Sequence, residues 1–79
     1  MVYPREVLLE LRWNRDDLDR ATITYVHRGA PGDVMTIRGS EIVDLGRSFM
    51  TTREATLPYH RIVRIEHRGS VLYDSHDYG

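Results

Sequence analysis

The sequence predicts an α+β fold in which an N-terminal helix packs on a small, twisted, mostly antiparallel sheet, with one extra short helix. The chain has 79 residues, which suffices for a single domain spanning residues 1–79 around one small core. Its opening segment carries apolar residues at helical spacing. Most later segments are short runs of β-branched and aromatic residues between turns that contain glycine or proline.

The first element is a predicted helix over residues 4–12. Pro4 suits a first helical position because its missing N–H is not needed there, and Glu6 lies in the first turn, where the helix dipole favours an anion. The spacing of Val7, Leu8 and Leu11 gives one apolar stripe. We expect Trp13, which follows directly, to anchor the core.

A polar, acidic stretch at residues 14–20 predicts a loop, and Leu18 is its only apolar residue. Residues 21–28 and 34–38 have strand composition, and the glycines and proline of residues 29–33 predict a turn between them. We therefore expect a β-hairpin with a loop of about five residues.

Residues 39–46 indicate the extra helix, of one to two turns. Ser40 is a favourable N-cap and Gly46 a favourable C-terminal residue.

The remaining residues predict three more extended segments and a closing strand. Residues 48–52 form a strand, 53–55 a turn and 56–59 a short extended piece, while 61–68 alternate most clearly between apolar and charged side chains. A turn at 69–70 leads to a strand at 71–73. We expect residues 75–79 to form a frayed tail.

Composition limits the possible functions. The absence of cysteine excludes disulfides and cysteine-ligated zinc. No apolar run approaches the ~20 residues that span a bilayer, and no signal-peptide pattern opens the chain, so we expect a cytoplasmic protein without membrane contact. Residues 20–69 hold eight arginines and five acidic residues, whereas the two ends together hold three arginines and seven acidic residues. This distribution favours a local anion site over a long nucleic-acid track.

Two His-Arg pairs are the candidate site. His27-Arg28 ends the first predicted strand, just before the turn, and His60-Arg61 follows Tyr59 at another strand boundary. Arginine grips phosphate with two parallel hydrogen bonds. Two imidazoles beside a phosphate can act as general base and general acid, or they can simply bind it, and the residues alone leave both possibilities open. We expect the pairs to converge on one concave, cationic face.

Other chemistries fit less well. The four histidines lack the spacing of metal ligands, and no cysteine assists them, so no metal or cofactor is predicted. A catalytic triad requires a serine on a sharp, exposed turn, whereas Ser40 is better explained as a cap and Ser70 as a turn residue, so a triad is disfavoured.

Five segments of the chain resemble a known family. They are Tyr25-Val26-His27-Arg28-Gly29-Ala30-Pro31-Gly32-Asp33, Pro58-Tyr59-His60-Arg61-Ile62, Pro4-Arg5-Glu6-Val7-Leu8, Leu11-Arg12-Trp13 and Ile37-Arg38-Gly39-Ser40-Glu41-Ile42. In these segments the chain is similar to a short archaeal family of uncharacterised proteins, also described as the RNA cyclic-group end-recognition, or RNA repair, domain. The similarity covers nearly the whole chain, although His67-Arg68 departs from the family pattern.

The resemblance implies a role at RNA 3′ ends that carry a 2′,3′-cyclic phosphate. Relatives occur fused to two-histidine phosphoesterase-like modules, so RNA-processing or phosphoesterase proteins are the implied partners. Carried over by matching positions, the phosphate-binding residues are His27, Arg28, Gly29, His60 and Arg61, with Tyr59 as a stacking or hydrogen-bonding neighbour.

Three functions follow from this reading. The preferred one is a non-catalytic RNA-binding module for phosphorylated or cyclic-phosphate ends. The first alternative is a metal-independent cyclic phosphodiesterase or small ribonuclease that uses His27 and His60. The second is a non-catalytic subunit that docks onto an RNA-processing complex.

Overall fold

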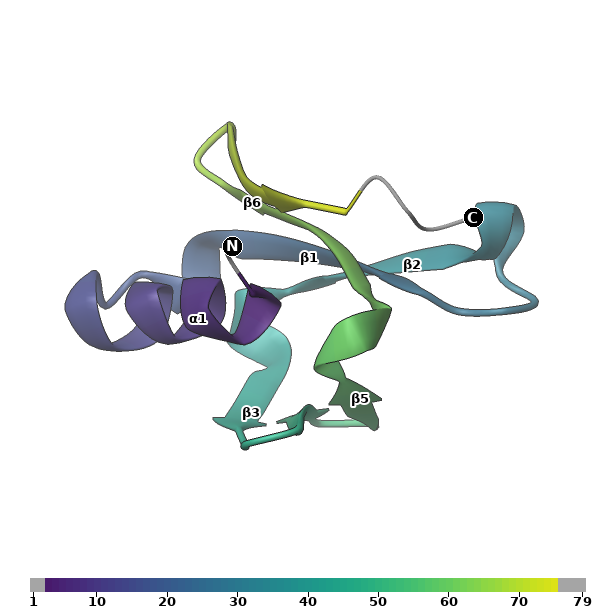
Figure 1. Cartoon of the computed structure of the whole chain (residues 1–79), viewed down its shortest axis with the longest axis horizontal. Coiled ribbons are helices and arrows are strands. Elements are labelled where there is room, and N and C mark those ends of the chain that lie inside the picture. Colours follow the sequence, from purple (N-terminus) through teal and green to yellow (C-terminus); the bar gives the residue numbers. More distant parts are fainter. Residues whose placement is uncertain (1–2, 76–79) are drawn as a thin grey trace.

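The computed structural model describes residues 3–75 and shows a short N-terminal helix with two antiparallel sheets (Figure 1). One sheet has four strands in the order β2-β1-β6-β7, and the other has three in the order β3-β4-β5. The predicted α+β class is confirmed, but the strands divide into two sheets. Their bounds are β1 Ala21–Val26, β2 Val34–Arg38, β3 Ile42–Leu45, β4 Phe49–Thr52, β5 Thr56–Pro58, β6 Ile62–His67 and β7 Ser70–Asp74.

The N-terminal helix consists of α1 (Pro4–Leu9) and a wider π-helical turn over Glu10–Asn14. Its apolar stripe is buried as predicted, with Leu8 and Leu11 fully inaccessible to solvent. The expectation that Trp13 anchors the core is wrong, because its side chain is 71% exposed. The helix runs past residue 12, so Trp13, two residues after Leu11, points away from the stripe. The guanidinium of Arg12 lies 5.3 Å from the Trp13 ring centroid.

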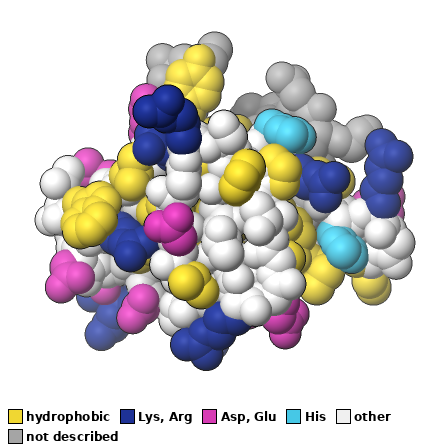
Figure 2. All heavy atoms as spheres, turned by 90° about the horizontal axis from the view of Figure 1, so that it is seen from below, with side chains coloured by type: hydrophobic (Ala, Val, Ile, Leu, Met, Phe, Trp, Pro, Cys, Tyr) yellow, Lys and Arg dark blue, Asp and Glu magenta, His cyan; other side chains and the backbone are white. Residues whose placement is uncertain are grey.

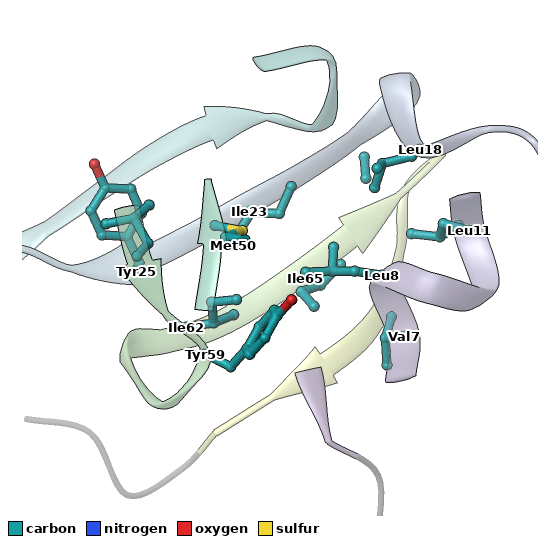
Figure 3. Packing of buried hydrophobic residues seen from close by; sticks show 12 residues of the cluster. Val7, Leu8, Leu11, Leu18, Ile23, Tyr25, Met50, Tyr59, Ile62 and Ile65 are labelled. Atoms are coloured by element: carbon teal, nitrogen blue, oxygen red, sulfur yellow. The ribbon is translucent and has the colours of Figure 1, made fainter. Parts of the chain in front are cut away.

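The core lies between one face of the four-stranded sheet and a cover formed by α1 and the small sheet (Figure 3). Alternate residues of β1 are buried, as a strand with one covered face requires. Met50 of β4 packs against this face near Ile23. Leu18, in a 3-10 turn over Leu18–Arg20, closes one end of the core.

The extra helix predicted at residues 39–46 is wrong. Residues Gly39–Glu41 form only a 3-10 turn, and the chain then enters β3. A carboxylate oxygen of Glu41 accepts the Arg38 backbone N–H at 2.9 Å, which closes the turn without Ser40 as a cap. The β-branched residues that follow favour a strand. Gly46 donates its N–H to the Phe49 carbonyl at 3.0 Å, so it belongs to the β3–β4 turn.

The predicted β1–β2 hairpin is confirmed, with Val26 paired to Val34. Its connection spans residues 27–33 and is longer than expected, because the chain makes a 3-10 turn over Pro31–Asp33 before β2. At the other end, the Ser75 N–H donates to the Val63 carbonyl at 2.8 Å. The rest of the expected frayed tail, residues 76–79, lies outside the described residues. Within residues 3–75, no helix has the length and apolarity that crossing a membrane requires.

Candidate functional site

The pairing of β1 with β6 brings the two His-Arg pairs together. These strands are antiparallel, and the last pair in their ladder joins Tyr25 to Ile62. His27 lies two residues after Tyr25, and His60 lies two residues before Ile62. The strand register therefore carries each histidine to the same end of the sheet, although 33 positions separate them in the sequence.

A surface hollow of about 650 Å³ lies at this point, lined by Val26, His27, Arg28, His60 and Arg61. The predicted convergence of the two pairs is confirmed. Ligand sites typically occupy roughly 300–1,000 Å³, so the hollow can hold a nucleotide. Among residues 3–75, its lining contains two arginines and no acidic residue. Figure 2 shows histidine and basic side chains close together at one end of the face that it views.

The turn after β1 holds the first pair in place. The His27 backbone N–H donates to the Asp33 carbonyl at 2.8 Å, and the Ala30 N–H donates to the His27 carbonyl at 3.2 Å. Gly29 has a φ of 97°, a left-handed conformation that glycine adopts without strain. Gly29 does not line the hollow; it supplies the backbone bend beside it. The Tyr25 ring meets the His27 ring edge-on at 6.2 Å and limits how that imidazole can lie.

The second pair is positioned by a 3-10 turn over Tyr59–Arg61, directly before β6. The register between β1 and β6 shifts there: Thr24 pairs with Arg64, but Tyr25 pairs with Ile62. Val63 is thus an extra residue, and such a bulge bends a strand and increases its twist. The pairing between β1 and β6 therefore ends beside the hollow.

Comparison with known proteins identifies the family. A family model described as "MJ1316 RNA cyclic group end recognition domain" matches residues 1–75.

The chain belongs to this family.

The resemblance found in the sequence is thereby confirmed. A UPF0248 protein of Thermococcus onnurineus is 37% identical over 73 residues, covering 90% of this chain and 83% of the relative. One of Methanopyrus kandleri is 34% identical over 59 residues, covering 75% and 80%. One of Thermococcus kodakarensis is 32% identical over 73 residues, covering 90% and 89%. No solved structure matches the chain significantly.

Of the residues that the family resemblance suggested for the site, Tyr59 lies apart from the hollow. Its side chain is only 8% exposed, and its hydroxyl donates to the Gly46 carbonyl at 2.7 Å. Burial raises the pKa of this phenol above its ordinary value. Figure 3 shows the ring among the core residues. Tyr59 therefore fixes the turn that carries His60, and it lines a neighbouring hollow instead of this one.

The arginines of the hollow are available to a ligand. Within residues 3–75, neither Arg28 nor Arg61 has a hydrogen bond or an ion pair at its guanidinium. Both side chains are exposed, as are His27 and His60. By contrast, Arg20, Arg64 and Arg68 each lie against a carboxylate.

His67 lies elsewhere, in a cluster that the sequence did not predict. Its Nε2 is 2.6 Å from a carboxylate oxygen of Asp17, and the Arg68 Nε–H donates to the same oxygen at 2.9 Å. Arg20 lies 3.2 Å from the other oxygen. The hydrogen bonds from His67 and Arg68 lower the pKa of Asp17. The cluster links the segment after the helix to the end of β6. Asp17 and His67 are 50 positions apart in the sequence, so no local pattern predicts their contact.

Within residues 3–75, no three His, Asp or Glu side chains lie close enough together to hold a metal ion. His76 lies outside the described residues. The chemistry on offer at the described hollow is hydrogen bonding and charge from two imidazoles and two guanidiniums.

Proposed function

We propose that this chain binds RNA 3′ ends that carry a phosphate or a 2′,3′-cyclic phosphate, and does so without cleaving them. The observation that carries the proposal is the hollow in which His27, Arg28, His60 and Arg61 converge. The description of the family, which names RNA cyclic-group end recognition, supports the same ligand.

The side chains of the hollow suit a terminal phosphate. A guanidinium can donate two parallel N–H groups to two phosphate oxygens, and a protonated imidazole donates one more charged hydrogen bond. None of the described residues that line the hollow carries a carboxylate that would repel the anion. A hydroxyl end offers none of these charged acceptors, so the hollow should distinguish it from a phosphorylated end.

Binding without turnover is favoured by exposure. All four polar side chains of the hollow are exposed to solvent. Catalysis by paired imidazoles gains much from a site that excludes water and holds its groups rigidly. A binding site needs only complementary charge and geometry, which the hollow already provides.

The proposal is tested with RNAs of one sequence, labelled at the 5′ end, that differ only in a 2′,3′-cyclic phosphate, a 3′-phosphate or a hydroxyl at the 3′ end. We expect the hydroxyl end to bind at least about tenfold more weakly, because charged hydrogen bonds contribute about 1.5–3 kcal/mol each. His27→Ala, His60→Ala and Arg61→Ala should remove most of that preference. Arg53→Ala is the matched control, since Arg53 is exposed in the β4–β5 turn and does not line the hollow.

Two results would contradict the proposal. Cleavage of the cyclic phosphate with a bell-shaped pH profile, lost in both histidine variants, would make the chain a phosphodiesterase. If the affinity does not depend on the chemical state of the 3′ end, the function that remains is a subunit that docks onto other RNA-processing proteins.

A further inference from the structure

A second hollow adjoins the first and shares His60 with it. It has a volume of about 630 Å³ and lies where the start of α1, the β3–β4 turn and β7 meet. The residues of its lining that matter here are Tyr3, Arg5, Glu6, Arg47, His60 and Tyr73. None of them apart from His60 belongs to the site described above.

Its charged groups favour an anion. The guanidinium of Arg47 has no hydrogen bond or ion pair to residues 3–75, and the side chain is exposed. Arg5 is held in place because its Nε–H donates to the Gly46 carbonyl at 2.9 Å. Within the described part of the chain, Glu6 is the one acidic residue of the lining, against two arginines and His60.

Its aromatic groups favour a base. The Tyr3 side chain is 56% exposed, and Tyr73 is half-buried at the edge of the core. Aromatic rings stack on nucleobases with little regard to sequence, because every base has a π-face. In the first hollow, by contrast, the described lining residues include no aromatic ring besides the two imidazoles.

We propose that the second hollow binds the nucleotide that precedes the terminal one. The terminal cyclic phosphate lies in the first hollow, and the phosphodiester that joins the two nucleotides passes His60 and contacts Arg47. The preceding base stacks on a tyrosine of the second hollow. This inference rests on the proposed function, and it makes the ligand a dinucleotide end instead of a lone terminal group.

The test compares a nucleoside 2′,3′-cyclic phosphate with di-, tri- and tetranucleotides that end in the same group. We expect the dinucleotide to bind about tenfold more tightly than the mononucleotide, from one stacked base and one ion contact. Further nucleotides should add little. Arg47→Ala and Tyr3→Ala should each remove much of the dinucleotide gain and leave the mononucleotide affinity unchanged, whereas His60→Ala should weaken both ligands.

Arg53→Ala is again the control, and a thermal unfolding curve for each variant separates lost binding from lost folding. Equal affinity of the native chain for mono- and dinucleotide would overturn the second site and leave the proposed function standing. A loss that is the same for both ligands in Arg47→Ala would also overturn it. If neither a cyclic-phosphate end nor a 3′-phosphate end binds at any length, the proposed function itself fails.

Discussion

At the scale of single residues, the buried hydroxyl of Tyr59 gives the most direct prediction about stability. It donates to the Gly46 carbonyl, which also accepts the Arg5 Nε–H, so removing the hydroxyl leaves that oxygen with a partner. We expect Tyr59→Phe to lower the free energy of unfolding by about 1 kcal/mol, measured by urea denaturation. Tyr73→Phe is the control, because the Tyr73 hydroxyl has no hydrogen bond to the described residues. Equal losses in the two variants would show that the Gly46 bond contributes nothing.

Asp17 gives a prediction about pH. Hydrogen bonds from His67 and Arg68 lower its pKa in the folded state, so its contribution to stability is fully present above the ordinary value of 3.8. That contribution is lost as the pH falls through the folded-state pKa. We expect Asp17→Asn to unfold at a lower temperature than the native chain at neutral pH.

The difference between native chain and Asp17→Asn should shrink as the pH falls below about 4, when the native carboxylate takes up its proton. Thermal unfolding from neutral to acidic pH measures this. Asp16→Asn is the matched control, because Asp16 is exposed and has a φ of 49°, which asparagine tolerates. A constant difference across the whole range would contradict the role of the Asp17 charge.

At the scale of elements, the 3-10 turn over Leu18–Arg20 contacts the 3-10 turn over Gly39–Glu41, and this contact depends on Gly39. A Cβ atom added at Gly39 would lie 1.8 Å from the Leu18 carbonyl oxygen, a backbone atom that cannot swing away. We expect Gly39→Ala to cost about 1–3 kcal/mol or more, because both turns must shift. At Gly32, with a φ of 70° and nothing within 4 Å of an added Cβ, alanine should cost only about 1–2 kcal/mol of backbone strain. Chemical denaturation compares the two, and a smaller cost at Gly39 would contradict this packing.

The elements that could be predicted from the sequence are those that local chemistry decides. Alternating β-branched residues predicted β1, β2 and β6, because a strand with one covered face needs that pattern. Residues 39–46 misled because serine and glycine serve both helix ends and turns, and the following Ile42 and Val43 decide for a strand. The prediction that Trp13 is buried was wrong because its exposure depends on where the helix ends, and the neighbouring residues do not specify that end.

The candidate site, too, could be predicted from the sequence only in part. The sequence identified His27-Arg28 and His60-Arg61 as strand-end motifs, and the structure brings them to one hollow. It could not predict that Tyr59 is mostly buried and lines the neighbouring hollow, because this burial follows from the packing of the small sheet. Arg47 gave no signal, and Arg5 stood only within a segment that carries the family resemblance, because the two come from separate elements and meet only through the tertiary fold.

At the scale of the whole molecule, the proposed contact between the two histidines and a phosphate predicts that RNA binding depends on pH. Histidine side chains ordinarily take up a proton near about pH 6.5, and a phosphate binds the protonated imidazole more strongly than the neutral one. We therefore expect the affinity for a cyclic-phosphate end to rise steadily from about pH 8 to about pH 6. The same titration in a variant that lacks both His27 and His60 should be nearly flat. A native affinity that is indifferent to pH would exclude the imidazoles from the contact.

The charge distribution of the whole chain predicts a weak response to salt. The net charge is −1, and the arginines of the two hollows that have neither a hydrogen bond nor an ion pair within residues 3–75 are Arg28, Arg47 and Arg61. Each phosphate neutralised on a single strand contributes about −0.7 to the slope of log affinity against log salt concentration, so two or three contacts predict roughly −1.5 to −2.

Filter binding or anisotropy over a series of salt concentrations measures that slope. Arg61→Ala should make it less steep by about 0.7, because one ionic contact is lost, while Arg53→Ala should leave it unchanged. A native slope near about −6 would require many phosphate contacts along a basic track. The acidic residues that outnumber arginine at the two ends of the chain argue against such a track, since they would repel an RNA strand laid across the molecule. A steep slope would therefore contradict recognition of the RNA end.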